Sequence, residues 1–570
     1  MNQREKGNWS KKTVAIAAAA VLLLTAGIAA FAGLRKQGES GDLLDVRLSS
    51  LWDAVSGDDG LPAPEGDMTV FLSLSDRDSK ARVFHASAPT LEEAWKAAES
   101  ETRRLTKKES LSPMWVKADV VTVRETVPLE SLEEELQNAA SQGCRMGLAL
   151  DPGMETAFLE TECNGNGLYD YESGTVSPEA IQAYSGTAAI LPAEVTLFLT
   201  QGYFCGMDNI TQKLSAEEKN FGVRRIVMGG ETAQGMALAA ASYLQSQVQE
   251  DGRFRYGRYA NGKEIPGYNA LRHWGAVWAL LEAYRISPDD GLAQDIDRAI
   301  NYALEDFVVY RDSDTAFVLD PSANEIKLGG GSLAVIALTA YEDIFDTDRH
   351  DPLLKALGNG ILTMSDPETG TYQHIWTPDY QLKFNFRTIF YDGEATFALC
   401  RLYGRDPNNA YLNMARKAAD RMIADEYEQY RDPWAAYAVN ELTRYDASPR
   451  YFDFALKNAW QLSDGNTASL NGAELLNAAW ETYTRAKELN VNLTLPEGFD
   501  EKRFSERIGE QMEGTLSSFG FPEAVMYFEH PMEFYGCCFV RQDGFRARID
   551  DAQHFICAYA QYARAERPVS

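Results

Sequence analysis

The alternation of hydrophobic and polar positions divides the chain into regions of different character. Residues 13–33 form a run of 21 uncharged and mostly apolar residues. Residues 67–225 contain short runs that resemble β-strands, with an amphipathic helical stretch among them. From residue 226 to residue 570 the apolar positions recur with a helical period. The pattern predicts a multidomain chain: a transmembrane helix, a small α+β domain and an all-α domain, with the Gly-, Asp-, Ser- and Pro-rich residues 34–66 as a flexible linker.

The all-α region repeats one phrase six times. Each copy begins with a short polar, often Gly-containing sequence and reaches an aromatic residue about four helical turns later. The copies are GYNALRHWGAVWALLEAY from Gly267, GGGSLAVIALTAY from Gly329, YDGEATFALCRLY from Tyr391, DPWAAYAVNELTRY from Asp432, NGAELLNAAWETY from Asn471 and IDDAQHFICAYAQY from Ile549. Repeats of this length are typical of helical hairpins stacked around a ring, because one hairpin cannot bury its own apolar face.

Six partner helices are expected between these stretches, and their composition differs. The partners carry most of the Lys and Arg on one face, whereas the six repeated stretches are nearly apolar all round. A helix that is apolar all round belongs inside a fold, and a helix with a charged stripe belongs outside. Six inner and six outer helices in alternation predict an (α/α)6 toroid.

The apolar run at 13–33 is preceded by four basic residues, Arg4, Lys6, Lys11 and Lys12. At ~1.5 Å per residue the run roughly matches a hydrocarbon core of about 30 Å, and the basic residues favour a cytoplasmic N-terminus. We therefore expect residues 1–12 to be a cytoplasmic tail and the globular domains to lie outside the cytoplasm. A signal peptide cleaved at Ala32 is the alternative, and it also places the domains outside.

Charge and cysteine content restrict the partners. The net charge is -30, and after the first 36 residues the chain carries 48 basic and 83 acidic residues. Such a surface repels nucleic acid, so we expect no nucleic-acid partner. The seven cysteines do not decide the redox compartment, and without a CxxC pair or a phosphate-binding loop we predict no metal and no cofactor. The oligomeric state stays open.

In an (α/α)6 toroid the inner helices run parallel, so the six polar openings should converge at one end of a central cavity. Helix N-termini leave backbone N–H groups unpaired and carry positive partial charge, which suits hydroxyl or carboxylate oxygens. The loops that precede several openings are rich in aromatic residues. Aromatic rings around a concave mouth are suited to stacking on sugars.

The twelve alternating helices, together with RHWGAVWALLEAY, FYDGEATFALCRLYG and the terminal RIDDAQH, resemble the six-hairpin glycosidase-like toroids. That group includes glycoside hydrolases, N-acylglucosamine epimerase-type proteins and the helical domain of glucuronyl epimerases. The resemblance covers about residues 226–566 and implies action on a carbohydrate without specifying the reaction. In the α+β region, the order strand, strand, helix, strand is similar to that of AMMECR1-type domains, without a motif that transfers a function.

Four side chains at the openings are candidate catalytic groups. Asp392 and Glu394 open the third inner helix, where acids also act as caps, and the helix turns Glu394 about 200° away from Asp392. Asp550 and His554 are four residues apart and share one face of the last inner helix, where they could orient a general acid or base. A buried histidine held by a neighbouring carboxylate is the alternative. Asp432 and Glu474, at other openings, are attributed mainly to capping.

Candidate substrate-binding residues lie at the same mouth. Tyr268, Arg272 and His273 cluster on the first inner helix. Arg272 could pair with Asp392 or Asp550, or hold a substrate carboxylate. The aromatic candidates for the wall of the site are Tyr391, Trp434 and Tyr535.

Two mechanisms and one non-catalytic role fit these residues. In an inverting hydrolase, Asp392 and Asp550 would act as acid and base on different inner helices. In an epimerase or lyase acting on a uronic acid, a Tyr or His would move the proton while an Arg neutralises the carboxylate. A membrane-tethered protein that binds or guides a polysaccharide would need neither. We expect a membrane-anchored, extracytoplasmic, carbohydrate-active protein, with a polysaccharide partner.

Overall fold

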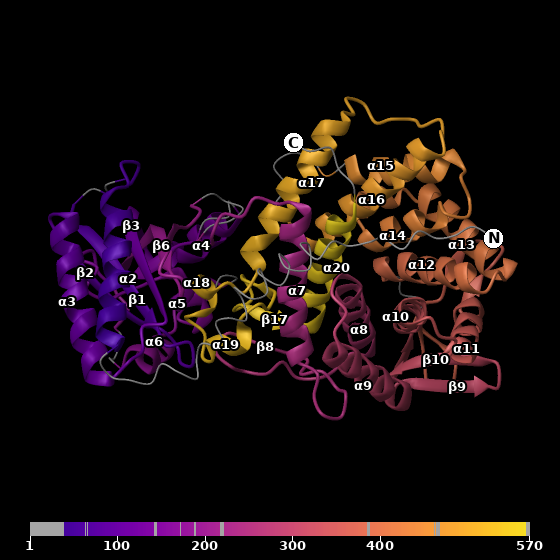
Figure 1. The fold of residues 1–570 in the computed structure, drawn as a ribbon, viewed down its shortest axis with the longest axis horizontal. Helices are drawn as coiled ribbons and strands as arrows, with labels where there is room; N and C mark the ends of the chain where they lie inside the picture. The colour runs from indigo at the N-terminus through magenta and orange to yellow at the C-terminus, as the bar shows by residue number, and fades with distance from the viewer. Residues whose placement is uncertain are drawn as a thin grey trace. The chain divides into compact units, whose positions relative to one another are not determined.

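The computed structural model describes residues 39–565, except for 63, 65, 142–144, 171–172, 187–189, 217–221, 385–387, 461 and 463–467. The predicted tail and membrane segment therefore lie outside the described residues. The chain divides into two compact units that interleave in sequence (Figure 1). Unit 1 comprises Met1–Val227, Gly257–Ile265 and Leu516–Ala547, and unit 2 comprises Met228–Tyr256, Pro266–Thr515 and Arg548–Ser570.

Unit 1 is built on an antiparallel sheet, as the alternating pattern predicts. Its strands run in the order β2 (Arg82–Ala88), β1 (Met68–Ser75), β3 (Trp115–Pro128), β6 (Glu194–Cys205), β4 (Gly147–Ala149) and β5 (Ala157–Phe158), and β7 (Thr211–Lys213) also pairs with β6. Helix α3 (Leu91–Glu109) connects β2 to β3, and it begins where the Thr90 side chain accepts a hydrogen bond from the Glu93 N–H. The smaller elements are α4 (Leu132–Ser141), α5 (Glu160–Gly165), α6 (Pro178–Ser185), β8 (Gly257–Arg258), α18 (Pro522–Val525), α19 (Pro531–Phe534), β16 (Phe539–Val540) and β17 (Arg546–Arg548).

The prediction of a flexible linker at 34–66 is wrong for much of that range. Residues Glu39–Ser56 form helix α2. Leu44, Leu48, Leu51 and Val55 recur at helical spacing, are buried, and pack with sheet residues in one hydrophobic core. The apolar stripe was present in the sequence, but the polar composition around it concealed the helix.

Residues 516–547 belong to unit 1, although the sequence pattern assigned all of 226–570 to the helical domain. Three pairings account for this assignment. The Tyr527 hydroxyl donates to Ser73 Oγ (2.9 Å), Glu523 pairs with Arg224 (2.6 Å), and Arg541 Nε donates to Glu160 Oε1 (3.0 Å). Buried charges are costly unless they are paired, so these contacts tie the segment to the sheet despite its position between two helices of unit 2.

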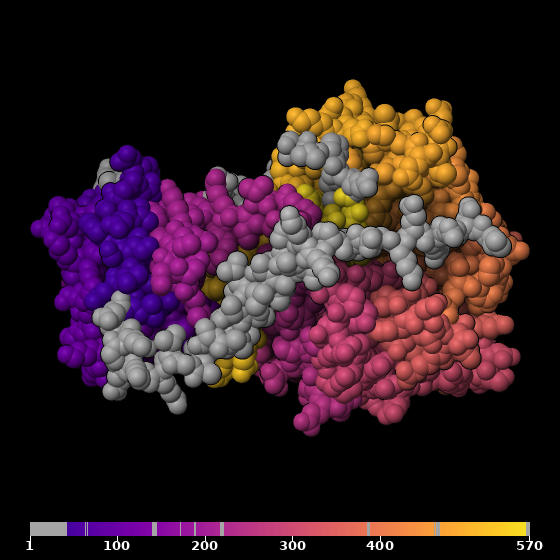
Figure 2. Space-filling model, in the orientation of Figure 1, coloured from indigo at the N-terminus to yellow at the C-terminus, as the bar shows by residue number. Residues whose placement is uncertain are grey.

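Unit 2 is a closed ring of helical hairpins, as predicted. The inner helices are α8 (Ala270–Ile286), α10 (Leu328–Phe345), α12 (Ile389–Arg405), α14 (Pro433–Leu442), α16 (Leu470–Glu488) and α20 (Ile549–Arg564). Each contacts the next, and α20 contacts α8. The outer helices are α7 (Gly230–Ser246), α9 (Asp290–Asp306), α11 (Asp351–Thr363), α13 (Asn409–Ala424), α15 (Pro449–Trp460) and α17 (Glu501–Thr515). In Figure 2 the surface of this unit passes from magenta through salmon and orange to gold as the hairpins follow one another.

Inner helix α10 is buried because it is apolar all round. Every residue of α10 from Leu328 to Glu342 is buried. Within the described part of the chain, α10 is the one helix long and apolar enough to cross a membrane, but 83% of it is buried in the protein. Its composition is therefore that of a core helix.

Small strands connect the hairpins on one side of the ring. The sheet order is β15 (Leu382–Phe384), β14 (Ile375–Trp376), β11 (Glu325–Lys327), β10 (Thr315–Asp320) and β9 (Val308–Asp312). A separate hairpin consists of β12 (Ser365–Asp366) and β13 (Thr371–Tyr372). These strands lead the chain into α10 and α12, and so they position the first turns of both helices.

Candidate functional site

Acidic side chains from several inner helices meet at the N-terminal end of the ring. At the first turn of α10, a Cβ on Gly329 would overlap Glu394 Oε2 of α12. The charges of Asp432, which caps α14, and of His554 on α20 both act on Glu394. His554 is in turn hydrogen bonded to Glu474 of α16. We call these side chains the ring cluster: Glu394, Asp432, Glu474, Asp550 and His554.

Glu394 is a buried carboxyl without a hydrogen-bond partner at one oxygen. The residue is 2% exposed, and among the described residues Oε2 has no hydrogen-bond partner. Burial, reinforced by the charge of Asp432, raises the pKa of Glu394 well above its usual range. The raised pKa favours the protonated carboxyl, which is the form that can donate a proton, although the charge of His554 acts in the opposite direction.

Asp432 combines a capping role with a raised pKa. Its carboxylate accepts hydrogen bonds from the backbone N–H groups of Trp434 (2.9 Å) and Ala435 (3.3 Å). Burial raises its pKa to about 8 against the effect of these two bonds, and the charges of Asp392 and Glu474 act in the same direction as burial. The capping role expected from the sequence is confirmed, and the raised pKa is an addition that only the packing of the ring produces.

His554 and Glu474 form a buried ion pair. The His554 Nδ1–H donates to Glu474 Oε2 (2.7 Å), and the Tyr437 hydroxyl donates to Glu474 Oε1 (3.0 Å). Burial lowers the pKa of His554, but the charge and hydrogen bond of Glu474, together with the charge of Asp550, raise it overall to about 9. The imidazole is therefore a cation at neutral pH, with 23% of its side chain exposed.

Asp550 remains ionised because two arginines hold it. Arg548 donates from Nε and Nη2 to its two oxygens (2.6 and 2.7 Å), and Arg272 Nε lies 2.9 Å from Oδ2. The Arg548 hydrogen bonds and the Arg272 charge outweigh burial and hold the pKa of Asp550 below its usual range. Of the two pairings that the sequence left open for Arg272, the structure contains the one with Asp550. Arg272 also donates to the Tyr256 hydroxyl.

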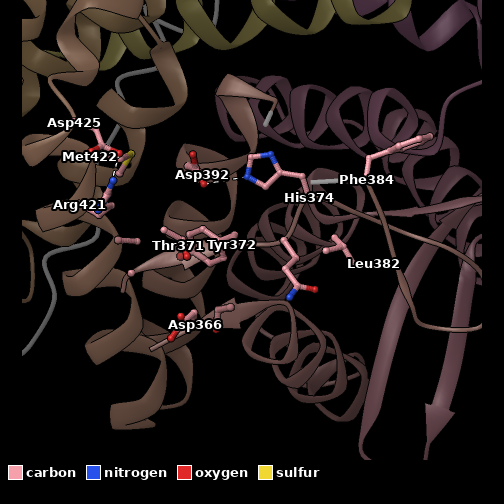
Figure 3. Close-up of a pocket in the computed structure, with 14 residues that line it drawn as sticks. Asp366, Thr371, Tyr372, His374, Leu382, Phe384, Asp392, Arg421, Met422 and Asp425 are labelled. Atoms are coloured by element: carbon pink, nitrogen blue, oxygen red, sulfur yellow. Dashed lines mark hydrogen bonds and ion pairs between the residues drawn. The ribbon is translucent and has the colours of Figure 1, made fainter. Parts of the chain in front are cut away.

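Asp392 lies beside His374 in the lining of a cavity (Figure 3). It accepts hydrogen bonds from His374 Nε2 (3.1 Å) and from the Tyr427 hydroxyl. His374 Nδ1 accepts from the Thr388 N–H (2.8 Å), so the ring proton is on Nε2 and points at Asp392. Residues two apart on a helix face nearly opposite directions, so α12 turns Glu394 inward and Asp392 outward. The structure therefore groups Glu394, and not Asp392, with Asp550.

Tyr268 and His273 lie in the core and not at the mouth. His273 is fully buried; its Nε2–H donates to the Ala299 carbonyl (2.8 Å), and its Nδ1 accepts from the Tyr268 hydroxyl (2.8 Å). Burial lowers the pKa of His273 to about 4, so it is neutral. Of this predicted trio, only Arg272 reaches the ring cluster.

The three predicted aromatic residues are separated. Tyr391 is partly buried, with Cε1 near Gly329, and Trp434 is 4% exposed and packs against the rings of His554 and Trp278. These two adjoin the ring cluster. Tyr535 belongs to unit 1, where its ring lies 6.3 Å from that of Trp115.

Glu474 is the member of the cluster that sequence reasoning undervalued. It is a fully buried acid between Ala473 and Leu475, which are also buried. An acid cannot remain in an apolar interior without a partner or a proton. An acid with apolar neighbours in an inner helix was therefore the signal in the sequence that could have identified Glu474 as a site residue.

The comparisons with known proteins concern the helical ring. No family model and no curated protein sequence matches the chain. Similar solved structures include a D-mannose isomerase, with 12% identity, a TM-score of 0.45 and coverage of 58% of this chain and 96% of the isomerase. They also include an α-1,6-mannanase of Salegentibacter sp. (14%, TM-score 0.43, covering 58% and 99%) and a cellobiose 2-epimerase of Bacillus thermoamylovorans (13%, TM-score 0.41, covering 51% and 88%).

Similarity at this level assigns neither an activity to this chain nor a role to any of its residues. None of these matches supports the similarity of the α+β region to AMMECR1-type domains. The structure itself defines the class of the protein. It is a ring of six helical hairpins with an acid–base cluster at the N-terminal ends of the inner helices.

Proposed function

We propose that this protein is a membrane-anchored, extracytoplasmic enzyme that cleaves or modifies a polysaccharide by acid–base chemistry at the ring cluster. One observation carries the proposal: the carboxyl of Glu394, whose pKa is raised, and the carboxyl of Asp550, whose pKa is lowered, both interact electrostatically with His554 in one cluster. Carboxyl groups whose environments push their pKa values apart can divide the roles of acid and base between them.

For hydrolysis, Glu394 gives its proton to the glycosidic oxygen as the bond to the anomeric carbon breaks. Water then adds to that carbon and gives a proton to the Glu394 carboxylate, which restores the acid for the next cycle. Asp550, held by Arg272 and Arg548, is a weak base, so its main contributions are to orient this water and to stabilise positive charge on the sugar ring. The side chain of Tyr391, which is partly buried, adjoins the site and offers a surface for a sugar ring.

A second candidate is epimerisation or elimination at a uronic acid, and the two arginines favour it. Arg272 and Arg548 both contact Asp550, and 30% of the Arg272 side chain is exposed. An arginine at this position could neutralise a substrate carboxylate while His554 moves a proton. A third candidate is a protein that binds a glycan without turnover. The same residues would then contact the glycan without catalysing a reaction.

The test is to incubate the full-length protein in detergent with neutral and uronate-containing polysaccharides and to analyse the products. We expect Glu394→Gln to reduce kcat by at least about 100-fold, the usual range for loss of a general acid. The matched control is Glu441→Gln, because Glu441 is also a buried inner-helix glutamate but pairs with Arg444 and not with the ring cluster. Its rate should stay within a few-fold of the wild type.

The outcomes separate the alternatives. New reducing ends from a neutral glycan support hydrolysis, and an altered or unsaturated uronate supports the second candidate. Binding without any product supports the non-catalytic role. If Glu394→Gln turns over as fast as the wild type, the assignment of Glu394 as the acid is wrong. The membrane location is tested separately, by labelling the globular units from the outside of intact cells.

A further inference from the structure

A cavity of about 460 Å³ lies in unit 2, lined by residues outside the ring cluster (Figure 3). Its walls are the β12–β13 hairpin, strand β15, the C-terminal end of outer helix α13 and the first turn of α12. The volume falls within the range of natural small-molecule sites, roughly 300 to 1,000 Å³. Asp392 lines this cavity, whereas Glu394, on the opposite face of α12, belongs to the ring cluster.

The polar lining of the cavity consists mainly of hydrogen-bond acceptors. Asp366, Asp392 and Asp425 contribute three carboxyl groups, and each carboxylate can accept up to about four hydrogen bonds. Arg421 is the arginine of the lining, and its charge is opposed by Asp425 at 2.8 Å. His374 has one proton, which it donates to Asp392. The lining is therefore net negative, and it suits a ligand that donates hydrogen bonds and carries no negative charge.

One edge of the cavity is apolar and open to solvent. Leu382 and Phe384 on β15 line it and are 46% and 52% exposed. The Lys383 ammonium lies 5.3 Å from the centre of the Phe384 ring and pairs with Glu325 at 2.7 Å, which helps to hold β15 and this ring in place. An exposed aromatic ring next to carboxylates matches the two faces of a sugar: C–H groups that stack, and hydroxyls that donate.

We propose that this cavity binds a segment of an uncharged, hydroxyl-rich glycan at a site separate from the ring cluster. The choice of a glycan as the ligand class rests on the proposed function, but the site itself does not require catalysis. Uronates and phosphates are disfavoured because Asp366, Asp392 and Asp425 would repel them. Such a site would hold a long substrate on the enzyme while the ring cluster acts on another part of the chain.

The experiment measures binding with turnover suppressed. Full-length protein carrying Glu394→Gln is titrated calorimetrically with neutral hexasaccharides (maltohexaose, cellohexaose and mannohexaose) and with hexagalacturonate. Phe384→Ala should weaken binding of the best neutral hexasaccharide about 3- to 10-fold, the equivalent of a typical aromatic contact. Tyr310→Ala is the matched control, because Tyr310 is 54% exposed on β9, at the other edge of the same sheet. It should leave binding unchanged.

A second variant tests whether weaker binding by Phe384→Ala results from a folding defect and not from loss of the contact with the ligand. Thr371 is exposed on β13 and lines the cavity, so Thr371→Trp should fill the space and abolish the same binding component. The proposal is overturned if no neutral hexasaccharide binds, if hexagalacturonate binds better, or if Phe384→Ala and Tyr310→Ala bind alike. Turnover of a short substrate by Phe384→Ala with Glu394 intact should equal that of the wild type, so loss of the cavity and loss of the catalytic cluster give different results.

Discussion

The ion pair between His554 and Glu474 leads to a quantitative prediction about the pKa of His554. Its hydrogen bond measures 2.7 Å, and its net effect raises the pKa of His554 from an ordinary value near 6.5 to about 9. That difference corresponds to about 3 kcal/mol of preference for the charged imidazolium. Burial acts in the opposite direction, so the combined attraction of Glu474, Asp550 and Asp551, of which Glu474 contributes most, is larger than the net value.

We predict that Glu474→Gln returns the pKa of His554 to 6.5 or below. The substitution keeps the shape of the side chain and an acceptor for the Tyr437 hydroxyl, but it removes the negative charge. Burial then remains as the main influence and favours the neutral ring, with a smaller opposing effect from Asp550. The matched control is Tyr437→Phe, which removes a hydrogen bond to Glu474 without removing the charge, and it should produce a much smaller shift.

The measurement is an NMR titration of protein labelled at histidine Cε1. The chain contains six histidines, and His554→Gln identifies the resonance of interest. The stability of unit 2 should show the same linkage. The folded-state pKa of His554 lies above its unfolded value, so its contribution is complete below about pH 6.5 and is lost as the pH rises through about 9. Thermal unfolding of the wild type should weaken across this window more than that of Glu474→Gln. An unchanged His554 midpoint in Glu474→Gln would refute the reasoning.

Two further predictions concern close packing in unit 2 and a buried ion pair in unit 1. In unit 2, Gly329→Ala should push the Glu394 carboxyl aside by about 1 Å and lower kcat about 100-fold. The control is Gly331→Ala, which has open space at its Cβ and should leave kcat unchanged. If steady-state kinetics give the same kcat for both variants, the placement of Glu394 is wrong. In unit 1, Arg541→Met should destabilise by about 3 to 5 kcal/mol in urea unfolding because it removes the ion pair of the buried Glu160 carboxylate with Arg541. Adding Glu160→Leu should recover much of the loss, and a single variant as stable as the double would contradict this expectation.

Local patterns in the sequence were sufficient to predict the helices of the ring and their order. Apolar residues all round an inner helix and a charged stripe on an outer helix reflect burial directly, and burial is the main determinant of which residues a helix carries. The main strands of unit 1 were predicted for the same reason. Helix α2 was missed because composition was given more weight than the spacing of Leu44, Leu48, Leu51 and Val55.

The tertiary structure alone decided which of these side chains form the site. Asp392 and Glu394 are separated by a single residue, and only the rotation of α12 within the ring directs one outward and the other to the cluster. Glu474 and His554 are 80 residues apart, and Glu160 and Arg541 are 381 apart. A hydrogen bond or a pKa depends on neighbours within a few ångströms, whatever their distance along the chain. The sequence alone therefore determined the ring and the end at which its polar residues gather, and the packing of the ring determined which carboxyl groups have a raised pKa and which has a lowered one.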